Sequence, residues 1–311
     1  MKTTKKYWIG ALLCLSQMLQ AQTADEAMEI QKRLDKVLAR KTSFTPYEKK
    51  ASETIVAEFD HLQTLRHELW KDKEDYGVTE RLWNLGNDQW PKEWLAFAYN
   101  VIDDLEEPYN ASRIWLKGYP FIALKEPVLA TQGAFFKVLD KHADALVRLK
   151  PEGEYSEDGS FSYWSGRLKE EDGSKFLKVS DEGQIPYFFT NDWVDDQQID
   201  VSKLYDLVGT VRESMADKDG PLAVHCAAGV GRTGTFITAY VLANLLDEMD
   251  ASAVSVEELV LTLSVQRHQM VRSAEQYQLL YEFVDYYVQR SRQEKSVIAE
   301  DGSTNLETSL R

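Results

Sequence analysis

The stretch Val224-His225-Cys226-Ala227-Ala228-Gly229-Val230-Gly231-Arg232-Thr233-Gly234 decides the fold, because it places a thiol and a guanidinium at the two ends of a five-residue loop. The residues just before it, Leu222–Val224, are short and apolar, as in a buried strand. After it, apolar residues recur at helical spacing from Phe236 to Leu246. The sequence therefore predicts a loop that joins the end of a strand to the start of a helix.

Such a loop is suited to binding a tetrahedral anion. Gly229 and Gly231 permit backbone conformations that other residues avoid, and inward-facing N–H groups next to a helix N-terminus form a nest of donors. Arg232 can grip two phosphate oxygens as a fork. The same donors favour the thiolate of Cys226, which is expected to be ionised at neutral pH and to act as a nucleophile. The residues expected to line the anion are His225, Ala227, Ala228, Gly229, Val230 and Gly231.

Two neighbours of this loop each have two interpretations. Thr233 can donate its hydroxyl to the sulfur and help it to leave, or it can cap the following helix. His225 can be a buried hydrogen-bond partner that orients the loop, or an ordinary core residue at the end of the strand.

The run HCxxGxxRTG resembles the signature of the cysteine-dependent protein tyrosine phosphatases, and further segments match landmarks of the tyrosine-specific branch in the same order. These are Tyr109–Ser112, Ala130–Gly133, Tyr163-Trp164, Gln266-Arg267, Met270-Val271 and Gln276-Tyr277. The resemblance covers residues 50–290. It implies an α/β fold, with a central twisted mixed β-sheet flanked by α-helices, and hydrolysis of phosphotyrosyl proteins without a cofactor or a metal.

The expected chemistry also needs a carboxylic acid that protonates the leaving phenolate. Trp193-Val194-Asp195 lies where the family carries its Trp-Pro-Asp loop, so the resemblance makes Asp195 the candidate general acid, with Asp196 as second choice. Val194 replaces the proline and removes a fixed φ angle, so looser closure of this loop is expected. Glu154, or Glu152 close by, is the candidate partner of the signature arginine.

Other positions depart from the family pattern. Arg272 stands where a glutamine is expected to hold the hydrolytic water, and a guanidinium has no acceptor with which to orient water. Gln276 matches a second glutamine of the family and can take over, although Ser273 and Gln276 also form a capping box. Ser264 stands where an arginine is expected to hold the tryptophan of the acid loop. No phosphotyrosine-recognition loop is evident, but its spacing points to residues 88–90, with Trp90 or Tyr99 lining the pocket.

Two alternative functions remain open at this point. A phosphoinositide or inositol-polyphosphate phosphatase would use the same loop, but such sites usually add lysines where this chain has Ala227 and Ala228. A phosphotyrosine-binding module with poor turnover would fit the departures at Val194, Ser264 and Arg272.

The N-terminus has the features of a secretory signal peptide. Lys2, Lys5 and Lys6 precede an apolar run, and Ala21 is a suitable cleavage residue. A lipid anchor at Cys14 and a buried N-terminal helix are the alternatives; the run is too short to span a bilayer. Cleavage would leave Cys226 as the sole cysteine. The expected location is outside the cell or in the periplasm, with delivery to a host cell as a further option.

Composition excludes some partners. The chain has 311 residues, 43% of them hydrophobic, and a net charge of −15; without the three signal lysines, 33 basic residues face 51 acidic ones, a net charge of −18. Nucleic acid and acidic membranes are poor partners for such a surface.

The pattern predicts four parts of the chain: a signal peptide at 1–21, a helical extension at 22–49, a catalytic domain at 50–290 and a polar, disordered tail at 291–311. Strands are expected at 128–130, 145–149, 161–168, 176–179 and 185–189. Helices are expected at 28–38, 55–69, 135–139, 199–211, 256–265 and 274–288.

Overall fold

A mixed β-sheet lies at the centre of the described part of the chain, as expected. The computed structural model describes residues 32, 44–69, 102, 109–154 and 162–308, of which 68, 69 and 294–308 are described by their backbone alone. Within these residues, seven strands form the sheet in the order β1-β2-β7-β3-β6-β5-β4. They are β1 (Ala111–Leu116), β2 (Tyr119–Leu124), β3 (Ala145–Leu149), β4 (Leu168–Glu171), β5 (Ser174–Lys178), β6 (Gln184–Thr190) and β7 (Leu222–His225).

Strand β7 occupies the middle of the parallel part of the sheet. It pairs in parallel with β2 on one side and with β3 on the other, and β3 pairs in parallel with β6. The outer pairs, β1 with β2 and β5 with both β4 and β6, are antiparallel. Ligands of parallel α/β sheets bind beyond the carboxyl ends of the strands, and the signature loop begins at that end of β7.

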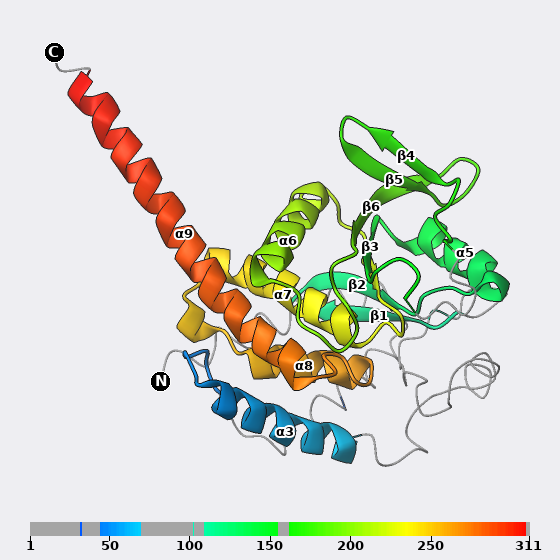
Figure 1. The fold of residues 1–311 in the computed structure, drawn as a ribbon, viewed down its shortest axis with the longest axis horizontal. Coiled ribbons are helices and arrows are strands. Elements are labelled where there is room, and N and C mark those ends of the chain that lie inside the picture. The colour runs from blue at the N-terminus through cyan, green and yellow to red at the C-terminus, as the bar shows by residue number, and fades with distance from the viewer. Residues whose placement is uncertain (1–31, 33–43, 70–101, 103–108, 155–161, 309–311) are drawn as a thin grey trace.

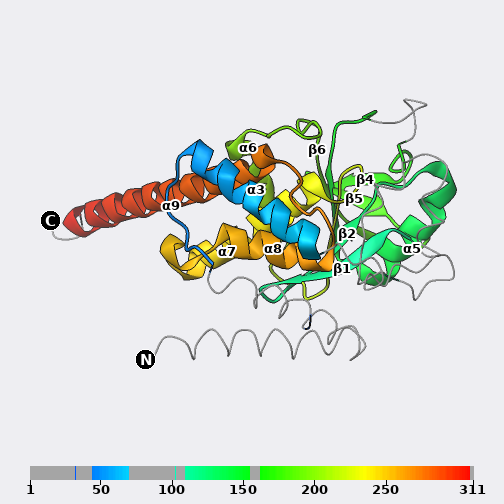
Figure 2. The same ribbon diagram turned by 90° about the horizontal axis from the view of Figure 1, so that it is seen from below.

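Helices cover both faces of the sheet. They are α3 (Ser52–Leu69), α5 (Gln132–His142), α6 (Val201–Met215), α7 (Gly231–Glu248), α8 (Val256–Gln266) and α9 (Ala274–Thr308). Figure 1 shows α5 on one side of the sheet and α6 to α9 on the other, while Figure 2 shows α3 lying along α8 and α9. Because strand side chains alternate, Leu222 and Val224 of β7 enter the core under α7, whereas Ala223 enters the core under α5.

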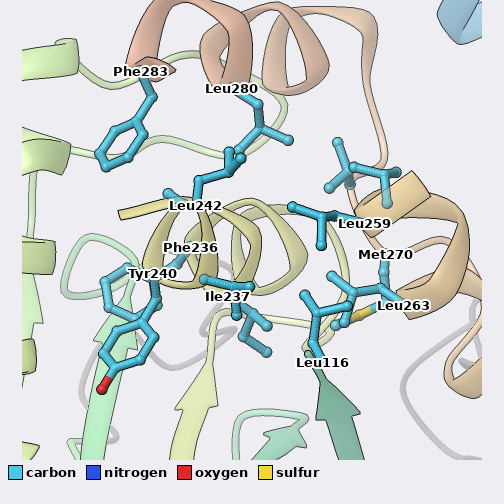
Figure 3. Close-up of a cluster of buried hydrophobic side chains, with 14 of the residues drawn as sticks. Leu116, Phe236, Ile237, Tyr240, Leu242, Leu259, Leu263, Met270, Leu280 and Phe283 are labelled. Carbon is cyan, nitrogen blue, oxygen red and sulfur yellow. The ribbon is translucent and has the colours of Figure 1, made fainter. Parts of the chain in front are cut away.

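Helix α7 is the centre of the larger core, and its first thirteen residues, Gly231–Ala243, are all buried. Figure 3 shows Leu280 and Phe283 of α9 above it, Leu259 and Leu263 of α8 beside it, and Leu116 of β1 below. A helix that is apolar on every side is stable only when it is surrounded in this way. Its N-terminus, which follows the signature loop, is therefore held in a fixed place.

Two expected strands are wrong, each because local hydrogen bonds close a turn. At 128–130 the chain forms a 3₁₀ turn (Leu129–Thr131). The Thr131 hydroxyl accepts from the N–H of Val128 at 3.1 Å, and the backbone N–H of Thr131 donates to the Val128 carbonyl at 2.9 Å. At 162–167 two turns follow one another, and Gly166 has a φ of 71°. Tyr163 packs there on α5, with its ring 4.9 Å from that of Phe135.

The sequence pattern also missed the hairpin of β1 and β2. Pro120 stands at the start of β2, where it lowers the strand propensity, and the turn at Lys117 and Gly118 has φ angles of 52° and 93°. At the other end of the chain, α9 continues to Thr308, whereas the sequence predicts disorder from residue 291. That segment contains many good helix formers, among them Gln, Glu, Lys and Arg, which allow the helix to continue.

The remaining expected helices are confirmed where the structure is described, and other expectations lie mostly outside the described residues. The helices expected within 55–69, 135–139, 199–211, 256–265 and 274–288 are confirmed. The signal peptide, the extension and the helix at 28–38 lie almost wholly outside the described residues, as do Trp90 and Tyr99. Where the structure is described, no helix is both long enough and apolar enough to cross a membrane.

Candidate active site

The signature loop, residues 226–232 and hereafter the phosphate loop, turns its carbonyl groups outward. The carbonyl of Ala227 accepts from the N–H of Glu126 at 2.9 Å. Those of Ala228 and Gly229 accept from the buried guanidinium of Arg267, at 3.1 Å from Nη2 and 2.9 Å from Nε. With three successive carbonyls pointing away, the amide N–H groups face the concave side, which is the arrangement of an anion-binding nest.

The two glycines of this loop are required for different reasons. Gly229 has a φ of 71°, and a Cβ there would lie 2.0 Å from the carbonyl oxygen of Leu124. Gly231, in contrast, has no positive φ, so the expectation that it supplies an unusual backbone conformation is wrong. A Cβ at Gly231 would lie 2.9 Å from the side-chain oxygen of Gln276. Its small size is what admits that side chain.

The sequence identifies Arg267 only as part of a segment that resembles the family, and it predicts no role for this residue. Its side chain is fully buried, and besides the two loop carbonyls it donates to Ser112 Oγ at 2.7 Å and to Asn110 Oδ1 at 2.9 Å. Burial lowers its pKa to about 10, which still leaves a cation at neutral pH. Arg267 therefore fixes the phosphate loop from behind and adds positive charge close to Cys226.

Cys226 lies at the floor of the loop and is 2% exposed. The hydroxyl of Thr233 donates to its sulfur at 3.3 Å. Thr233 does not cap the helix, because α7 begins at Gly231 and its N-cap position is Val230. The position of the Thr233 hydroxyl therefore suits stabilisation of a thiolate.

His225 is enclosed between the sheet and α5. Its Nδ1 lies 3.0 Å from the carbonyl oxygen of Cys226, which can only accept, so Nδ1 carries the hydrogen. Its Nε2 then accepts from the hydroxyl of Tyr163 at 2.6 Å. Burial lowers the pKa of His225 to about 3. The imidazole is thus neutral and orients the backbone at Cys226. This agrees with the interpretation of His225 as a buried hydrogen-bond partner rather than an ordinary core residue.

Arg232 brings the remaining candidate residues together. Its Nη1 donates to the carbonyl oxygen of Trp193 at 2.6 Å. Its Nη2 lies 2.7 Å from Glu154 Oε2 and 3.1 Å from Asp195 Oδ1; the first contact is an ion pair rather than an aligned hydrogen bond. Nη2 is thus ion-paired with the two carboxylates, whereas Nε has no hydrogen-bond acceptor among the described residues and can donate to a phosphate oxygen.

The charges around Arg232 reinforce one another. Burial by itself lowers the pKa of Arg232, but negative charge on Cys226 and on the two carboxylates outweighs burial and raises that pKa above its usual value. Glu154 also accepts from the N–H of Asp195 at 3.0 Å, so it ties the acid segment, residues 193–198, to the arginine. Glu152 accepts instead from Ser162 at 3.0 Å. The expected pairing thus falls to Glu154.

Gln276 reaches the phosphate loop from the first turn of α9. Its Oε1 accepts from the N–H of Arg272 at 2.9 Å, and its own N–H lies 3.3 Å from Ser273 Oγ, the capping interaction expected from the sequence. The side chain is fully buried, and Nε2 has no acceptor among the described residues. This leaves an N–H donor beside Gly231, where it can hold a water molecule.

The loop between α8 and α9, residues 267–273, is braced by α3, which was expected only to pack. Arg66 is buried there and donates to the carbonyls of Met270 at 2.6 Å and Val271 at 2.9 Å. The N–H of Val271 in turn donates to the carbonyl of Val230 at 3.4 Å.

Ser264 donates to the carbonyl of Val260 at 2.8 Å. No group of three or more His, Cys, Asp or Glu residues gathers in a metal-binding arrangement within the described part of the chain.

Comparison with known proteins connects this site to one family. Residues 174–286 match the family model described as protein-tyrosine phosphatase. Tyrosine phosphatase H3 of Microplitis demolitor bracovirus is 28% identical over 210 residues, which are 56% of this chain and 64% of that protein. Receptor-type tyrosine-protein phosphatase F of Mus musculus is 31% identical over 221 residues, 61% of this chain and 12% of its own length. The chain thus spans less than two thirds of each of these relatives.

Solved structures agree on the fold. The catalytic domain of human protein tyrosine phosphatase non-receptor type 18 superposes with a TM-score of 0.63 at 20% identity, over 76% of this chain and 96% of that one. A second structure of that enzyme, described as a complex with HER2-pY1248 phosphopeptides, gives a TM-score of 0.62, also at 20% identity, over 75% of this chain and 99% of that one. At this identity the likeness shows the fold alone. Residues 174–286 thus match the protein-tyrosine phosphatase family model, and the described part of the chain has the fold of a protein tyrosine phosphatase catalytic domain.

Proposed function

We propose that the protein is an exported phosphatase that hydrolyses phosphotyrosyl proteins through a cysteinyl-phosphate intermediate. One observation carries this proposal. The guanidinium of Arg232 interacts with the charge of Cys226 and keeps Nε without an acceptor among the described residues, while Asp195 lies 3.1 Å from its Nη2. An anion-binding donor set, a nucleophile and a carboxylic acid therefore meet at one point.

In the first step the sulfur of Cys226 attacks phosphorus, and the bond from phosphorus to the tyrosyl oxygen breaks. Arg232 and the loop amides hold the three equatorial oxygens, whose negative charge grows in the transition state. Asp195 gives its proton to the departing phenolate. Glu154 contributes by holding both the guanidinium and the backbone of Asp195.

In the second step a water molecule attacks the phosphorus of the cysteinyl phosphate, and the S–P bond breaks. The side chain of Gln276 is suited to hold this water, since its Nε2 lacks an acceptor among the described residues and its Oε1, which accepts one N–H from Arg272, has a second lone pair that can accept from the water. Asp195, now a carboxylate, takes the proton of the water. Thr233 donates to the departing thiolate, and inorganic phosphate is released.

A phosphotyrosyl protein is the substrate that best fits the surroundings of the loop. Ala227 and Ala228 add no positive charge, whereas an inositol polyphosphate carries several phosphates that need cations. The chain as a whole is acidic, with a net charge of −15, so the substrate is attracted by the local charge of Arg232 and Arg267. A solved relative is described as a complex with phosphopeptides, which supports this substrate class.

An assay with three substrates tests the proposal. Purified protein is given a phosphotyrosyl peptide, an inositol polyphosphate and an aryl phosphate, beside Cys226→Ser and Asp195→Ala. We expect turnover of the peptide, none by Cys226→Ser, and a loss of roughly 10²–10⁴-fold for Asp195→Ala. Asp192→Ala is the matched control, because Asp192 pairs with Lys203 at the surface. Peptide binding without turnover would identify a binding module, and hydrolysis of the inositol phosphate alone would identify the other enzyme class.

Export is the second part of the proposal and is supported by the basic and apolar pattern of residues 1–21. We expect the mature protein to begin at Gln22 and to be found in the periplasm or outside the producing cell. Mass spectrometry of the mature N-terminus and fractionation of the cells check both expectations. An intact N-terminus on cytosolic protein would contradict them.

A further inference from the structure

Two contacts connect the acid segment to the chain around the start of α9. Arg272 Nε lies 3.8 Å from Asp196 Oδ1, in the residue that follows the candidate acid Asp195. Gln198 Nε2 donates to the carbonyl of Glu275 at 2.9 Å. Arg272 is the residue that stands in place of the expected glutamine. The substitution therefore puts a cation where it can reach the acid segment.

The Arg272 side of this connection is held firmly. The backbone N–H of Arg272 donates to Gln276, and its carbonyl accepts from Gln63 Nε2 of α3 at 3.4 Å. The two residues before it are fixed by the buried Arg66. Because the anchoring residues belong to α3 and α9, the position of Arg272 does not depend on the acid segment.

The acid segment, in contrast, presents exposed side chains to solvent. Val194 is 44% exposed and lacks the fixed φ that proline would supply, and the Asp196 side chain is 50% exposed. Asp196 has a φ of 53°, a conformation that is unusual for residues other than Gly, Asn and Asp. The inner contacts of the segment depend on the charges of Arg232 and Glu154. An outer contact would add to its stability over the site.

We propose that Arg272 and Asp196 form a latch that holds the acid segment over the phosphate loop and so keeps Asp195 in reach of the leaving group. Both are positioning residues in this account, because they act through Asp195. The inference rests on the proposed function for its effect on catalysis. This latch is a role for Arg272 itself. Holding the hydrolytic water is instead the role of the glutamine that is expected at this position.

The size of the effect follows from exposure. The Arg272 side chain is 26% exposed and the Asp196 side chain 50%, so solvent weakens their attraction. We expect removal of the pair to lower the ratio of closed to open acid segments about two- to fivefold. Loss of a general acid would instead lower the rate by roughly 10²–10⁴-fold. The size of the rate loss therefore distinguishes a positioning role of Asp196 from a role as the general acid.

Rapid kinetics on full-length protein test the latch. At saturating substrate, Asp196→Asn should slow leaving-group release about two- to fivefold for an aryl phosphate with a poor leaving group. A substrate whose leaving group needs no proton should be unaffected. Asp192→Asn is the control, since Asp192 is similarly exposed, at 56%, but pairs with Lys203. Joining Arg272→Asp with Asp196→Arg should restore the rate that each single reversal loses.

A second measurement does not depend on catalysis. In a Cys14→Ser, Cys226→Ser background, Val194→Cys is labelled with a trifluoromethyl ketone, and its fluorine spectrum reports the state of the segment. Asp196→Asn should change the ratio of resonances about two- to fivefold, and high salt should have the same effect on the unmodified segment. Identical spectra with and without Asp196→Asn, or equal kinetic losses in Asp192→Asn, would overturn the latch. Absence of peptide turnover with a changed spectrum would overturn the function and keep the latch.

Discussion

Gln276 serves the second step of the proposed reaction through its side-chain amide. We expect Gln276→Ala to leave the attack of Cys226 nearly unchanged and to slow hydrolysis of the phosphoenzyme about tenfold, the value of one hydrogen bond to a charged transition state. A burst of leaving group in stopped-flow measurements would show the change. Gln278→Ala, two residues along the same helix, is the control, since Gln278 bonds Ser52 and Glu282 instead. Equal bursts in both variants would contradict this role.

His225 should make the stability of the protein depend on pH. Its pKa is about 3 in the folded state and about 6.5 when unfolded, so the unfolded chain binds more protons between these values. The contribution is complete above pH 6.5 and is lost as pH falls, by up to roughly 1.4 kcal/mol per pH unit. Urea unfolding at pH 7 and pH 5 should show a smaller decrease for His225→Gln than for the unmodified protein. Equal decreases would refute the expectation.

The sequence predicted the residues that do chemistry better than those that hold them. Cys226, Arg232 and Thr233 are fixed by spacing in one loop, so their proximity follows from local geometry. Arg267 and Arg66 act through backbone carbonyls far away in the chain, and no periodic pattern indicates such contacts. Buried arginines are rare. Arg267 stands between Gln266 and His268, so its neighbours in the chain do not indicate that it is buried.

Strand β7, the phosphate loop and α7 form one unit whose geometry depends on a close backbone approach at Gly229. We expect Gly229→Ala to destabilise the fold by more than about 2 kcal/mol, because Cβ would enter the Leu124 carbonyl and the φ of 71° is strained. Gly209→Ala is the control: Gly209 lies within α6 with nothing near its missing Cβ, and this change should stabilise by about 0.5–1 kcal/mol. Urea denaturation of both variants checks the prediction; equal effects would contradict it.

Elements were predictable where periodicity and burial agree. Strand β3 and helix α8 follow their patterns closely, whereas α5 extends three residues beyond the expected 135–139 at each end. The patterns failed at 128–130 and 162–167, where a Thr131 hydroxyl and a glycine at positive φ close turns beneath apolar residues. Tyr163 is apolar because it packs on α5, and not because its backbone is extended, whereas Leu129 is 76% exposed and its apolar side chain indicates neither burial nor a strand. Burial and backbone conformation are separate properties there.

For the whole molecule, occupation of the phosphate loop should raise global stability. A ligand that binds only the folded state stabilises by about 2.7 kcal/mol at one hundred times its dissociation constant. We expect orthovanadate to raise the Tm of the unmodified protein and of Thr233→Ser. Arg232→Met should abolish the shift, because it removes the positive charge and the available Nε donor. A full shift in Arg232→Met would show that the anion binds elsewhere.

The place of β7 in the sheet has a consequence for the order in which the molecule becomes active. β7 lies between β2 and β3, both of which precede it far back in the chain. During synthesis those two strands emerge first and have no neighbour between them until residues 222–225 arrive. Contacts between distant parts of a chain form slowly. A nascent chain therefore lacks the phosphate loop until β7, the last of the seven strands to be synthesised, has entered between β2 and β3.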